Sequence, residues 1–246
     1  MIVHIIGLLL AFVPAYLLGS IPTGFLVGKL AGIGDIRQTG SGNIGATNMV
    51  RAGGKKLGAV VLLLDIAKGA AGFYWSILVN VAYHMPLLDR HDVMHVRIDK
   101  PYVEWLLGAL WLLAILGVFV GHMFTIWLKF RGGKGISIVI GSLLALPMTT
   151  LLPVAGYVPV AVFLVVWLSI YAITKTSSLA GLSATLVMPC FFLALTLFFP
   201  ATAWTFDRCV PLYSVVTLLV FYRHHDNIRR LLRGEEMAFK KNQPSP

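Results

Sequence analysis

Apolar runs alternate with short polar segments along almost the whole chain, and the runs are long enough to cross a membrane. A membrane-spanning helix needs roughly 20 mostly apolar residues. Seven runs approach or exceed this length, at residues 2–30, 57–83, 103–120, 136–152, 156–173, 179–199 and 210–222. The pattern predicts an all-α integral membrane protein, a bundle of seven transmembrane helices. The alternative is six spans and one interfacial segment, because the last run is short and three residues separate the fourth run from the fifth.

The composition agrees with this pattern. The chain has 246 residues, of which 58% are hydrophobic and 12% are charged, whereas about 25% of the residues of a typical soluble domain are charged. No Lys or Arg precedes Lys29, so the first run predicts a retained helix and not a cleaved signal peptide. The two cysteines, Cys190 and Cys209, indicate neither a disulfide framework nor a metal cluster. We expect a single membrane domain over residues 1–246, with a mobile cytoplasmic tail at 237–246.

Basic side chains divide unequally between the loops on the two sides of the predicted bundle. Seven spans leave fifteen Lys and Arg residues in one set of alternating loops, counting Lys29 at the end of the first run, and four in the other, with Lys68 inside a span. Because cytoplasmic loops carry the excess of Lys and Arg, the N-terminus is predicted outside and the C-terminus in the cytoplasm. The formal net charge of +10 then reflects topology and attraction to anionic lipid headgroups, and not nucleic-acid binding. The longest outer connection, residues 84–102, is predicted to be a solvated hairpin.

One polar segment on the predicted cytoplasmic face, TGSGNIGATNMVR at residues 39–51, contains the pattern G-x-G-x-x-G. A dinucleotide-binding turn needs a preceding strand and a parallel sheet, and this segment follows a membrane helix, so we reject that interpretation. Glycine nevertheless lets backbone N–H groups approach an anion, and Arg51 can bind phosphate through two N–H groups. The segment adds the neutral donors Thr39, Ser41, Asn43, Thr47 and Asn48.

A second segment on the same predicted face, FRGGKG, places Gly132, Gly133 and Gly135 around Lys134. Its spacing does not match a nucleotide-binding P-loop. Each loop taken alone also fits a tight turn whose basic residues follow the positive-inside rule. Two cationic glycine loops on one membrane face together favour phosphate binding.

Two pairs of polar residues at helical spacing are further candidates. Asp65 and Lys68 lie three apart in the second run and share a helix face. Intramembrane charges are costly and usually paired, so a structural ion pair and a substrate contact by Lys68 are both open. In the tail segment HHDNIRR, His224 and Asn227 share a helix face by the same spacing, and His224 is a candidate for substrate binding or proton transfer.

Three segments together resemble the signature regions of one family. GSGNIGATNMVR at 40–51, GHMFTIWLKFRGGKG at 121–135 and HHDNIRRLLRGEE at 224–236 are similar to those of the bacterial acyl-phosphate:glycerol-3-phosphate acyltransferases, and GSIPTGFLVGKL and DIAKG agree. The resemblance implies a seven-helix inner-membrane enzyme with its active site on the cytoplasmic face. It implies transfer of a fatty acyl group from acyl-phosphate to the 1-hydroxyl of sn-glycerol 3-phosphate. The products are lysophosphatidic acid and inorganic phosphate, in the first step of phospholipid synthesis.

The resemblance also assigns site residues. It implies catalytic roles for Ser41, Arg51, Lys134 and His224. It implies substrate or phosphate binding by Asn43, Thr47, Asn48, Gly133, Gly135, Ser178 and Asn227, to which the spacing argument adds Lys68. Ser177 or Ser178 matches a serine pair of the family, but the sequence departs from the family there, because KTSSL is shorter in serine and lacks the aromatic–valine–serine lead. No cofactor and no metal is implied, and the expected partners are the two substrates, membrane lipid and a peripheral enzyme that forms the acyl-phosphate.

A membrane transporter for an organic phosphate is the competing interpretation. Many such transporters carry internal repeats and bind their substrate near the middle of the membrane. No internal repeat is found in this sequence, and the polar segments collect at one predicted face. The sequence therefore favours the enzyme.

Overall fold

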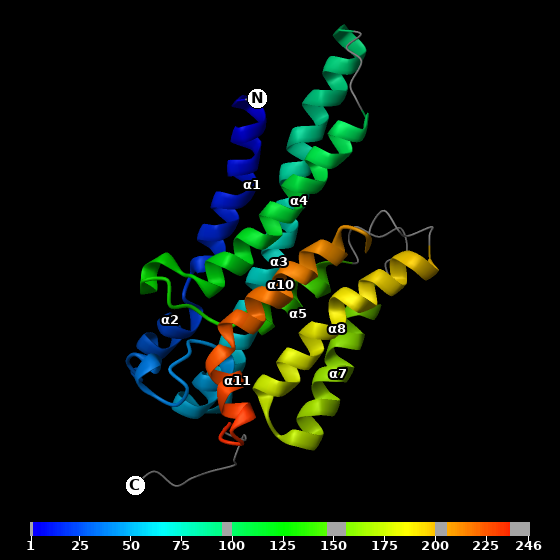
Figure 1. The fold of residues 1–246 in the computed structure, drawn as a ribbon. Helices are drawn as coiled ribbons and strands as arrows, with labels where there is room; N and C mark the ends of the chain where they lie inside the picture. The colour runs from blue at the N-terminus through cyan, green and yellow to red at the C-terminus, as the bar shows by residue number, and fades with distance from the viewer. Residues whose placement is uncertain (1, 95–99, 147–155, 200–205, 237–246) are drawn as a thin grey trace. The chain divides into compact units, whose positions relative to one another are not determined.

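The computed structural model describes residues 2–94, 100–146, 156–199 and 206–236 (Figure 1). Within these residues all regular structure is helical. The chain forms two compact units, Met1–Leu146 and Pro147–Pro246. The tail predicted to be mobile, residues 237–246, lies outside the described residues.

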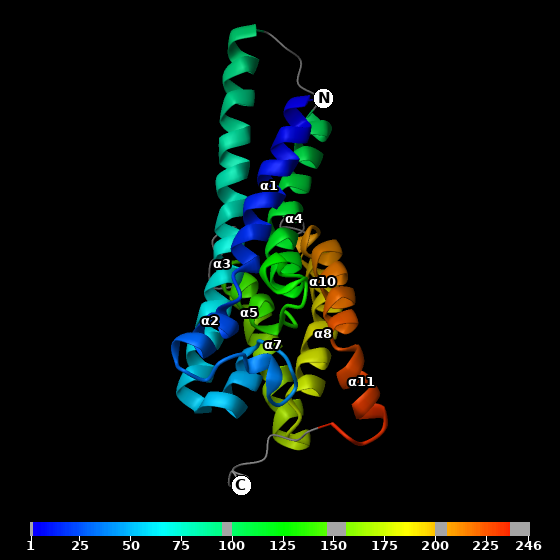
Figure 2. The ribbon, with the colours of Figure 1, turned by 90° about the vertical axis from the view of Figure 1, so that its left-hand side faces the viewer.

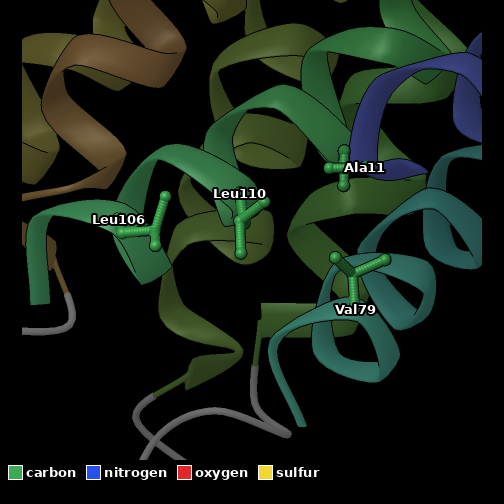
Figure 3. Close-up of a cluster of buried hydrophobic side chains, with 5 residues drawn as sticks. Ala11, Val79, Leu106 and Leu110 are labelled. Carbon is green, nitrogen blue, oxygen red and sulfur yellow. The ribbon is translucent and has the colours of Figure 1, made fainter. Parts of the chain in front are cut away.

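Three long helices form the body of the first unit. Helices α1 (Ile2–Ser20), α3 (Ala46–Met94) and α4 (Lys100–Met123) lie side by side (Figures 1 and 2). Their apolar faces meet in a cluster of aliphatic side chains, and Figure 3 shows where Ala11, Val79, Leu106 and Leu110 lie on the three helices. The cluster consists of Ala11, Val79, Leu106, Leu110 and Ala114.

Glycines bring the backbones of α1 and α4 into contact. A Cβ added to Gly121 would overlap the carbonyl oxygen of Tyr16, and one added to Gly19 would overlap the carbonyl oxygen of Val118. In a membrane, where water does not drive apolar helices together, such small residues allow the close van der Waals packing that holds helices in place. The first and fourth helices are therefore fixed at close range near the ends that lead into the polar loops.

The first predicted span is broken into two helices. Helix α1 ends at Ser20, and α2 (Thr23–Leu30) begins after Pro22. Proline has no N–H to donate and disfavours a helical conformation in the residue before it, so Pro22 favours a break here, although α1 itself continues through Pro14. The break could not be predicted from the apolar run at 2–30, because hydropathy carries no information on the direction of the chain.

Helix α3 also departs from a simple span. Gly54 has φ 84° and ψ 174°, and it separates a short first segment, which begins at Ala46, from the long helix that follows. That helix continues to Met94, and α4 begins at Lys100. Most of the predicted hairpin at 84–102 is therefore helical and not an irregular loop, while its solvation stays a prediction. A change from apolar to polar residues marks the end of a membrane run, but residues of both kinds form helices.

Helix α5 (Ile136–Ala145) packs tightly on the middle of α3. A Cβ at Gly69 would overlap the carbonyl oxygen of Ile138, and one at Gly141 would overlap that of Ile66. The first turn of α5 is thereby held beside the Asp65–Lys68 turn of α3.

The second unit contains α7 (Val158–Thr174), α8 (Ser177–Phe198), α10 (Cys209–Arg223) and α11 (His225–Leu232). Helix α8 lies beside both α7 and α10 (Figures 1 and 2). Phe192 of α8 stacks on Tyr213 of α10 with ring centroids 4.9 Å apart, and the Thr217 hydroxyl donates to the carbonyl oxygen of Thr185 at 3.2 Å. These contacts fix α10, and hence the start of α11, against α8.

The described helices support a multi-pass membrane protein. Four of them are long and apolar enough to cross a membrane, within His4–Leu30, Ala46–Ala82, Trp105–Leu128 and Ser177–Phe198. Three further apolar helices are shorter, at Ile136–Ala145, Val158–Thr174 and Cys209–Arg223. Each of the seven predicted runs contains a helix, while the number of spans and their orientation stay predictions.

Candidate functional site

The glycine-rich loop at 39–51 is folded around the side chain of Asn48. This amide is buried, and its Nδ2 donates to the carbonyl oxygens of Ile36, Thr39 and Asn43 at 2.8, 3.1 and 2.8 Å. Its Oδ1 accepts the N–H of Ser41 at 2.9 Å. One side chain therefore closes the loop from the inside, as expected for a buried amide whose hydrogen-bonding groups are all in use.

Two glycines give this loop its shape. Gly40 and Gly42 have φ of 55° and 68°, in the left-handed region that residues with a Cβ rarely adopt. A Cβ on Gly40 would also overlap the Asn48 amide oxygen, and Cδ of Arg51 passes 3.5 Å from the same point. The aliphatic part of Arg51 thus lies beside the loop.

The same loop leads directly into α3. The carbonyl oxygen of Gly45 accepts the N–H groups of Asn48 and Met49, each at 3.1 Å, and α3 begins at the next residue. The first N–H groups of a helix have no partner within the helix and favour an anion. Around this point Ser41, Asn43 and Thr47 are partly exposed and Arg51 is exposed. Four of the predicted site residues are therefore accessible at one loop, whereas Asn48 is used to build it.

A short helix before the loop carries an ion pair. In η1 (Ile36–Gln38), Asp35 accepts the backbone N–H of Arg37 at 3.0 Å, and the Arg37 guanidinium donates to the same carboxylate at 2.5 Å. The hydrogen bond from the Arg37 side chain lowers the pKa of Asp35. The pair stabilises the turn that enters the loop.

The second glycine loop follows a strained turn. After η2 (Ile126–Leu128), Lys129 and Phe130 have φ of 53° and 61°. The N–H groups of Gly132 and Gly133 then donate to the carbonyl oxygens of Met123 and His122, at 3.1 and 2.9 Å.

The second loop requires glycine for two reasons: a Cβ would overlap neighbouring atoms at two positions, and a third position has a positive φ. A Cβ on Gly132 would overlap the carbonyl oxygen of His122, and a Cβ on Gly133 would overlap the His122 ring. Gly135, with φ of 88°, caps the start of α5. Between these glycines Lys134 is partly exposed. The loop presents one cation on a backbone that has no room for larger residues.

Behind these loops, the first unit buries a cluster of four polar side chains. Lys68 Nζ lies 2.9 Å from the Asp65 carboxylate and 3.4 Å from Nδ1 of His122. The Thr23 hydroxyl donates to the same Asp65 oxygen at 2.5 Å. None of the four side chains is more than 7% exposed. The predicted pairing of Asp65 with Lys68 is present, and its links to Thr23 and His122 were not predicted.

The second unit has a polar cluster of its own, centred on Glu236. One of its carboxylate oxygens accepts from the Ser178 hydroxyl at 2.7 Å and from Asn227 Nδ2 at 2.5 Å. The other accepts from Nε of Arg230 at 2.7 Å. Burial raises the pKa of the Glu236 carboxyl, but the three hydrogen bonds and the Arg230 charge outweigh this effect and lower it. The sequence assigned Ser178 and Asn227 to the site. Both donate to the carboxylate of Glu236, which the sequence did not assign to the site.

His224 stands at the junction between α10 and α11. Its ring is buried, and its Nδ1 lies 2.7 Å from the carbonyl oxygen of Val220. Because a carbonyl oxygen can only accept, Nδ1 carries the hydrogen, and the basic nitrogen of the neutral ring is Nε2. The adjacent His225 is exposed. His224 and Asn227, which the spacing argument placed on one helix face, are both buried.

The predicted residues fall into two groups. The first unit holds the two glycine loops and Lys68, and the second unit holds Ser178, His224 and Asn227. The contributions of Thr23 and of Glu236 were not predicted from the sequence. A signal for Glu236 was available, since it ends the segment HHDNIRRLLRGEE. Within the described residues, no group of three or more His, Cys, Asp or Glu side chains is arranged to hold a metal ion.

Comparisons with known proteins give one result. A family model described as glycerol-3-phosphate acyltransferase matches residues 9–234. A glycerol-3-phosphate acyltransferase of Mesorhizobium japonicum is 39% identical over 230 residues, which cover 94% of this chain and 95% of that protein. One of Rhodopseudomonas palustris is also 39% identical, over 92% of this chain and 93% of that protein.

Solved structures agree with the sequence comparison. A crystal structure of PlsY (YgiH), an integral membrane glycerol 3-phosphate acyltransferase, in its glycerol 3-phosphate form has a TM-score of 0.68 and 31% sequence identity. The match covers 95% of this chain and 96% of that one. The lysophosphatidic acid form of PlsY has a TM-score of 0.65 and 30% identity. The chain therefore belongs to the glycerol-3-phosphate acyltransferase family.

Proposed function

We propose that this protein transfers a fatty acyl group from acyl-phosphate to the 1-hydroxyl of sn-glycerol 3-phosphate, releasing 1-acyl-sn-glycerol 3-phosphate and inorganic phosphate. The observation that carries the proposal is the pair of cationic glycine loops in the first unit. Each loop needs glycine for its backbone, and each carries a basic side chain, Arg51 or Lys134. Both substrates carry phosphate, so two such loops match the charge of the reactants. The glycerol 3-phosphate and lysophosphatidic acid forms of PlsY agree with this substrate and product.

The chemistry requires little from a protein base. An acyl-phosphate is a mixed anhydride with a good leaving group, so positioning and electrostatic stabilisation carry most of the catalysis. The hydroxyl oxygen of glycerol 3-phosphate attacks the acyl carbon, and a new C–O ester bond replaces the C–O bond to phosphate. The hydroxyl proton passes to a base or to a phosphate oxygen. No acyl-enzyme is formed in this scheme.

In this proposal Arg51 and Lys134 bind phosphate and offset the charge that develops on the leaving group. Ser41 and His224 complete the catalytic set. With Nδ1 bonded to Val220, Nε2 of His224 is the nitrogen that would accept the hydroxyl proton or hold a substrate phosphate. The residues proposed to bind substrate or phosphate are Asn43, Thr47, Gly133, Gly135, Ser178 and Asn227, and Asn48 contributes through the loop that its side chain closes.

The proposal includes a topology. Seven spans would place the N-terminus outside and the basic loops and C-terminus in the cytoplasm, in a bacterial inner membrane, as the distribution of Lys and Arg favours. The acyl donor would arrive from the cytoplasmic side, from a peripheral enzyme that forms acyl-phosphate. Its hydrocarbon chain would enter from the bilayer.

Purified protein in detergent, supplied with glycerol 3-phosphate and palmitoyl-phosphate, tests this function. We expect phosphate release that depends on both substrates. We also expect mass spectrometry to detect 1-acyl-sn-glycerol 3-phosphate. Palmitoyl-CoA serves as the control donor and should give no product. Uptake of glycerol 3-phosphate into proteoliposomes without acyl transfer would instead support an organic-phosphate transporter. Trapping of a stable acyl group on Ser41 would overturn the direct attack.

A further inference from the structure

The buried cluster of Thr23, Asp65, Lys68 and His122 has no part in the reaction as described above. Its members come from three helices, Thr23 from α2, the charged pair from α3 and His122 from α4. All of them are buried, and two carry formal charge within an apolar segment. Such charges are expensive in a membrane and persist where they serve a purpose.

One purpose is visible at the break between α1 and α2. Pro22 ends the helical hydrogen bonding, and backbone carbonyls near a helix end need other donors. Lys68 Nζ lies 2.9 Å from the carbonyl oxygen of Ile21 and 3.5 Å from that of Gly19. The hydroxyl of Thr125 donates to the carbonyl oxygen between them, that of Ser20. The cation of the buried pair thus holds the broken helix in place.

The cluster also reaches toward the first glycine loop. Thr23, which donates to Asp65, is followed by Gly24, where a Cβ would overlap the carbonyl oxygen of Ile44 in the loop. A Cβ on Gly28, one turn later in α2, would crowd the Ile36 side chain, 2.7 Å away. Helix α2 therefore packs against the loop. The hydrogen bond from Thr23 to Asp65 fixes the position of the first residue of α2.

At its other side the cluster reaches the second loop. His122 faces Lys68 through Nδ1, and its ring lies against Gly133, whose N–H donates to the His122 carbonyl oxygen at 2.9 Å. The contacts therefore run without interruption from Ile44 of the first loop to Gly133 of the second, through α2 and the buried cluster.

We propose that Thr23, Asp65, Lys68 and His122 form a positioning network that sets the spacing between the two glycine loops. Lys68 acts through the helix break and His122, and it does not touch substrate. Only the identity of the ligands that the two loops hold depends on the proposed function. Two phosphate-bearing substrates that react with one another, hydroxyl oxygen on acyl carbon, must be held to within a fraction of an ångström, and a misplacement of 1 Å can cost about 100-fold in rate. A fully bonded buried network is rigid enough for that task.

The contact between His122 and Gly133 gives the first test. Gly133→Ala should lower the rate of phosphate release about 100-fold by pushing the loop off the ring, and His122→Ala alone should lower it about tenfold. In the double variant the smaller side chain makes room for the new methyl group. We expect the double variant to be no worse than His122→Ala, because the two changes act on one contact. Losses that multiply to about 1,000-fold would overturn the proposal.

The buried ion pair gives the second test, which separates positioning from substrate contact. Lys68→Met leaves the buried Asp65 carboxylate without its cation and should lower the rate about 100-fold. Adding Asp65→Asn removes that charge, so the double variant should regain at least about tenfold, with the remaining loss in KM for glycerol 3-phosphate. If Lys68 bound substrate, the cation would be missing from both variants, and equal activity in the two would overturn the proposal. Lys29→Met, at an exposed lysine of α2, is the matched control.

Melting temperatures in detergent separate the positioning role from folding and from the proposed function. Inorganic phosphate should raise the melting temperature of the wild-type protein, fail to raise that of Lys68→Met and raise that of the double variant. This pattern does not need acyl transfer, so it tests the network even where the proposed reaction fails. An equal phosphate response in Lys68→Met and wild type would overturn the network. If Lys68→Met does not fold, the His122 and Gly133 variants decide the matter.

Discussion

The two polar clusters of this protein use charge in opposite ways. In the first unit, the ammonium of Lys68 is directed at backbone carbonyls and one carboxylate, in a region where the surrounding residues are apolar. In the second unit, the carboxylate of Glu236 collects donors from Ser178, Asn227 and Arg230 in a polar segment that follows α10. One cluster joins helices to loops, and the other joins side chains to a single acid.

The first cluster is therefore a fixed framework, whereas the second cluster can change with the protonation of Glu236. Breaking the first cluster would leave a buried charge and several carbonyls without donors, which is costly in a medium of low dielectric. Glu236 is only partly buried, and protonation alone removes most of its attraction for Arg230. The variants below test this contrast, beginning with the largest expected effect.

The largest effect is expected at the loop that the first cluster supports. Lys134→Ala should lower the rate of phosphate release about 100- to 1,000-fold, because it removes a fixed charge from a site that stabilises developing charge. The melting temperature should change little, since Lys134 is partly exposed. Lys129→Asn is the control, because Lys129 is exposed, has φ of 53°, and asparagine tolerates this conformation. Full activity in Lys134→Ala would remove the second loop from the mechanism.

The next effect concerns how the first loop is built. Asn48→Ala removes four hydrogen bonds from a buried position and should destabilise the loop by about 2–3 kcal/mol. Asn48→Asp keeps the shape but turns an acceptor toward three carbonyl oxygens, so we expect at least as large a loss. Hydrogen exchange of residues 39–51 measures the change, with Gln38→Ala as an exposed control. If exchange stayed unchanged while KM rose, Asn48 would bind substrate and would not organise the loop.

The sequence predicted the helices well and their interruptions poorly. Each apolar run contains a helix, because residues in a membrane must satisfy their backbone bonds internally. Averaged hydropathy does not detect the break at Pro22 or the kink at Gly54, since both depend on single residues. Nor does it separate a membrane run from the polar helix that extends it to Met94.

The site was predictable where chemistry and spacing coincide. Gly40, Gly133 and the pairing of Asp65 with Lys68 follow from residue type and local position. The bond from Thr23 to Asp65 spans 42 residues of sequence and that from Ser178 to Glu236 spans 58. No local pattern encodes such contacts, because they depend on how the helices pack.

A substitution in the second cluster should have a smaller effect than a substitution in the first. Glu236→Gln keeps the size of the side chain but removes the charge that attracts Arg230 and the other donors. We expect a loss of about 1–2 kcal/mol in the local stability of α11, which corresponds to one charge-assisted interaction. Hydrogen-exchange protection over residues 225–236 measures it. Glu235→Gln, at the exposed neighbouring residue, is the matched control and should leave protection unchanged. An equal loss in both variants would show that total charge matters and not the cluster.

The smallest effect is the pH dependence of the same cluster. The hydrogen bonds from Ser178, Asn227 and Arg230 outweigh the effect of burial and hold the pKa of Glu236 below its usual value. A carboxyl with a lowered folded-state pKa adds stability that is complete above its unfolded pKa, about 4.3 for glutamate, and is lost as the pH falls through the folded value. Protection of residues 225–236 should therefore be constant from about pH 7 to 5 and decrease below about pH 4.

Glu236→Gln provides the control for this pH dependence, because it leaves the exposed Asp226 and Arg229 unchanged. Exchange rates corrected for their intrinsic pH dependence should show no acid-induced loss in this variant beyond that shared with wild type. A wild-type protein whose protection falls in parallel with the variant would place the acid sensitivity at Asp226 or elsewhere. The contrast between the two clusters would then reduce to their partners alone.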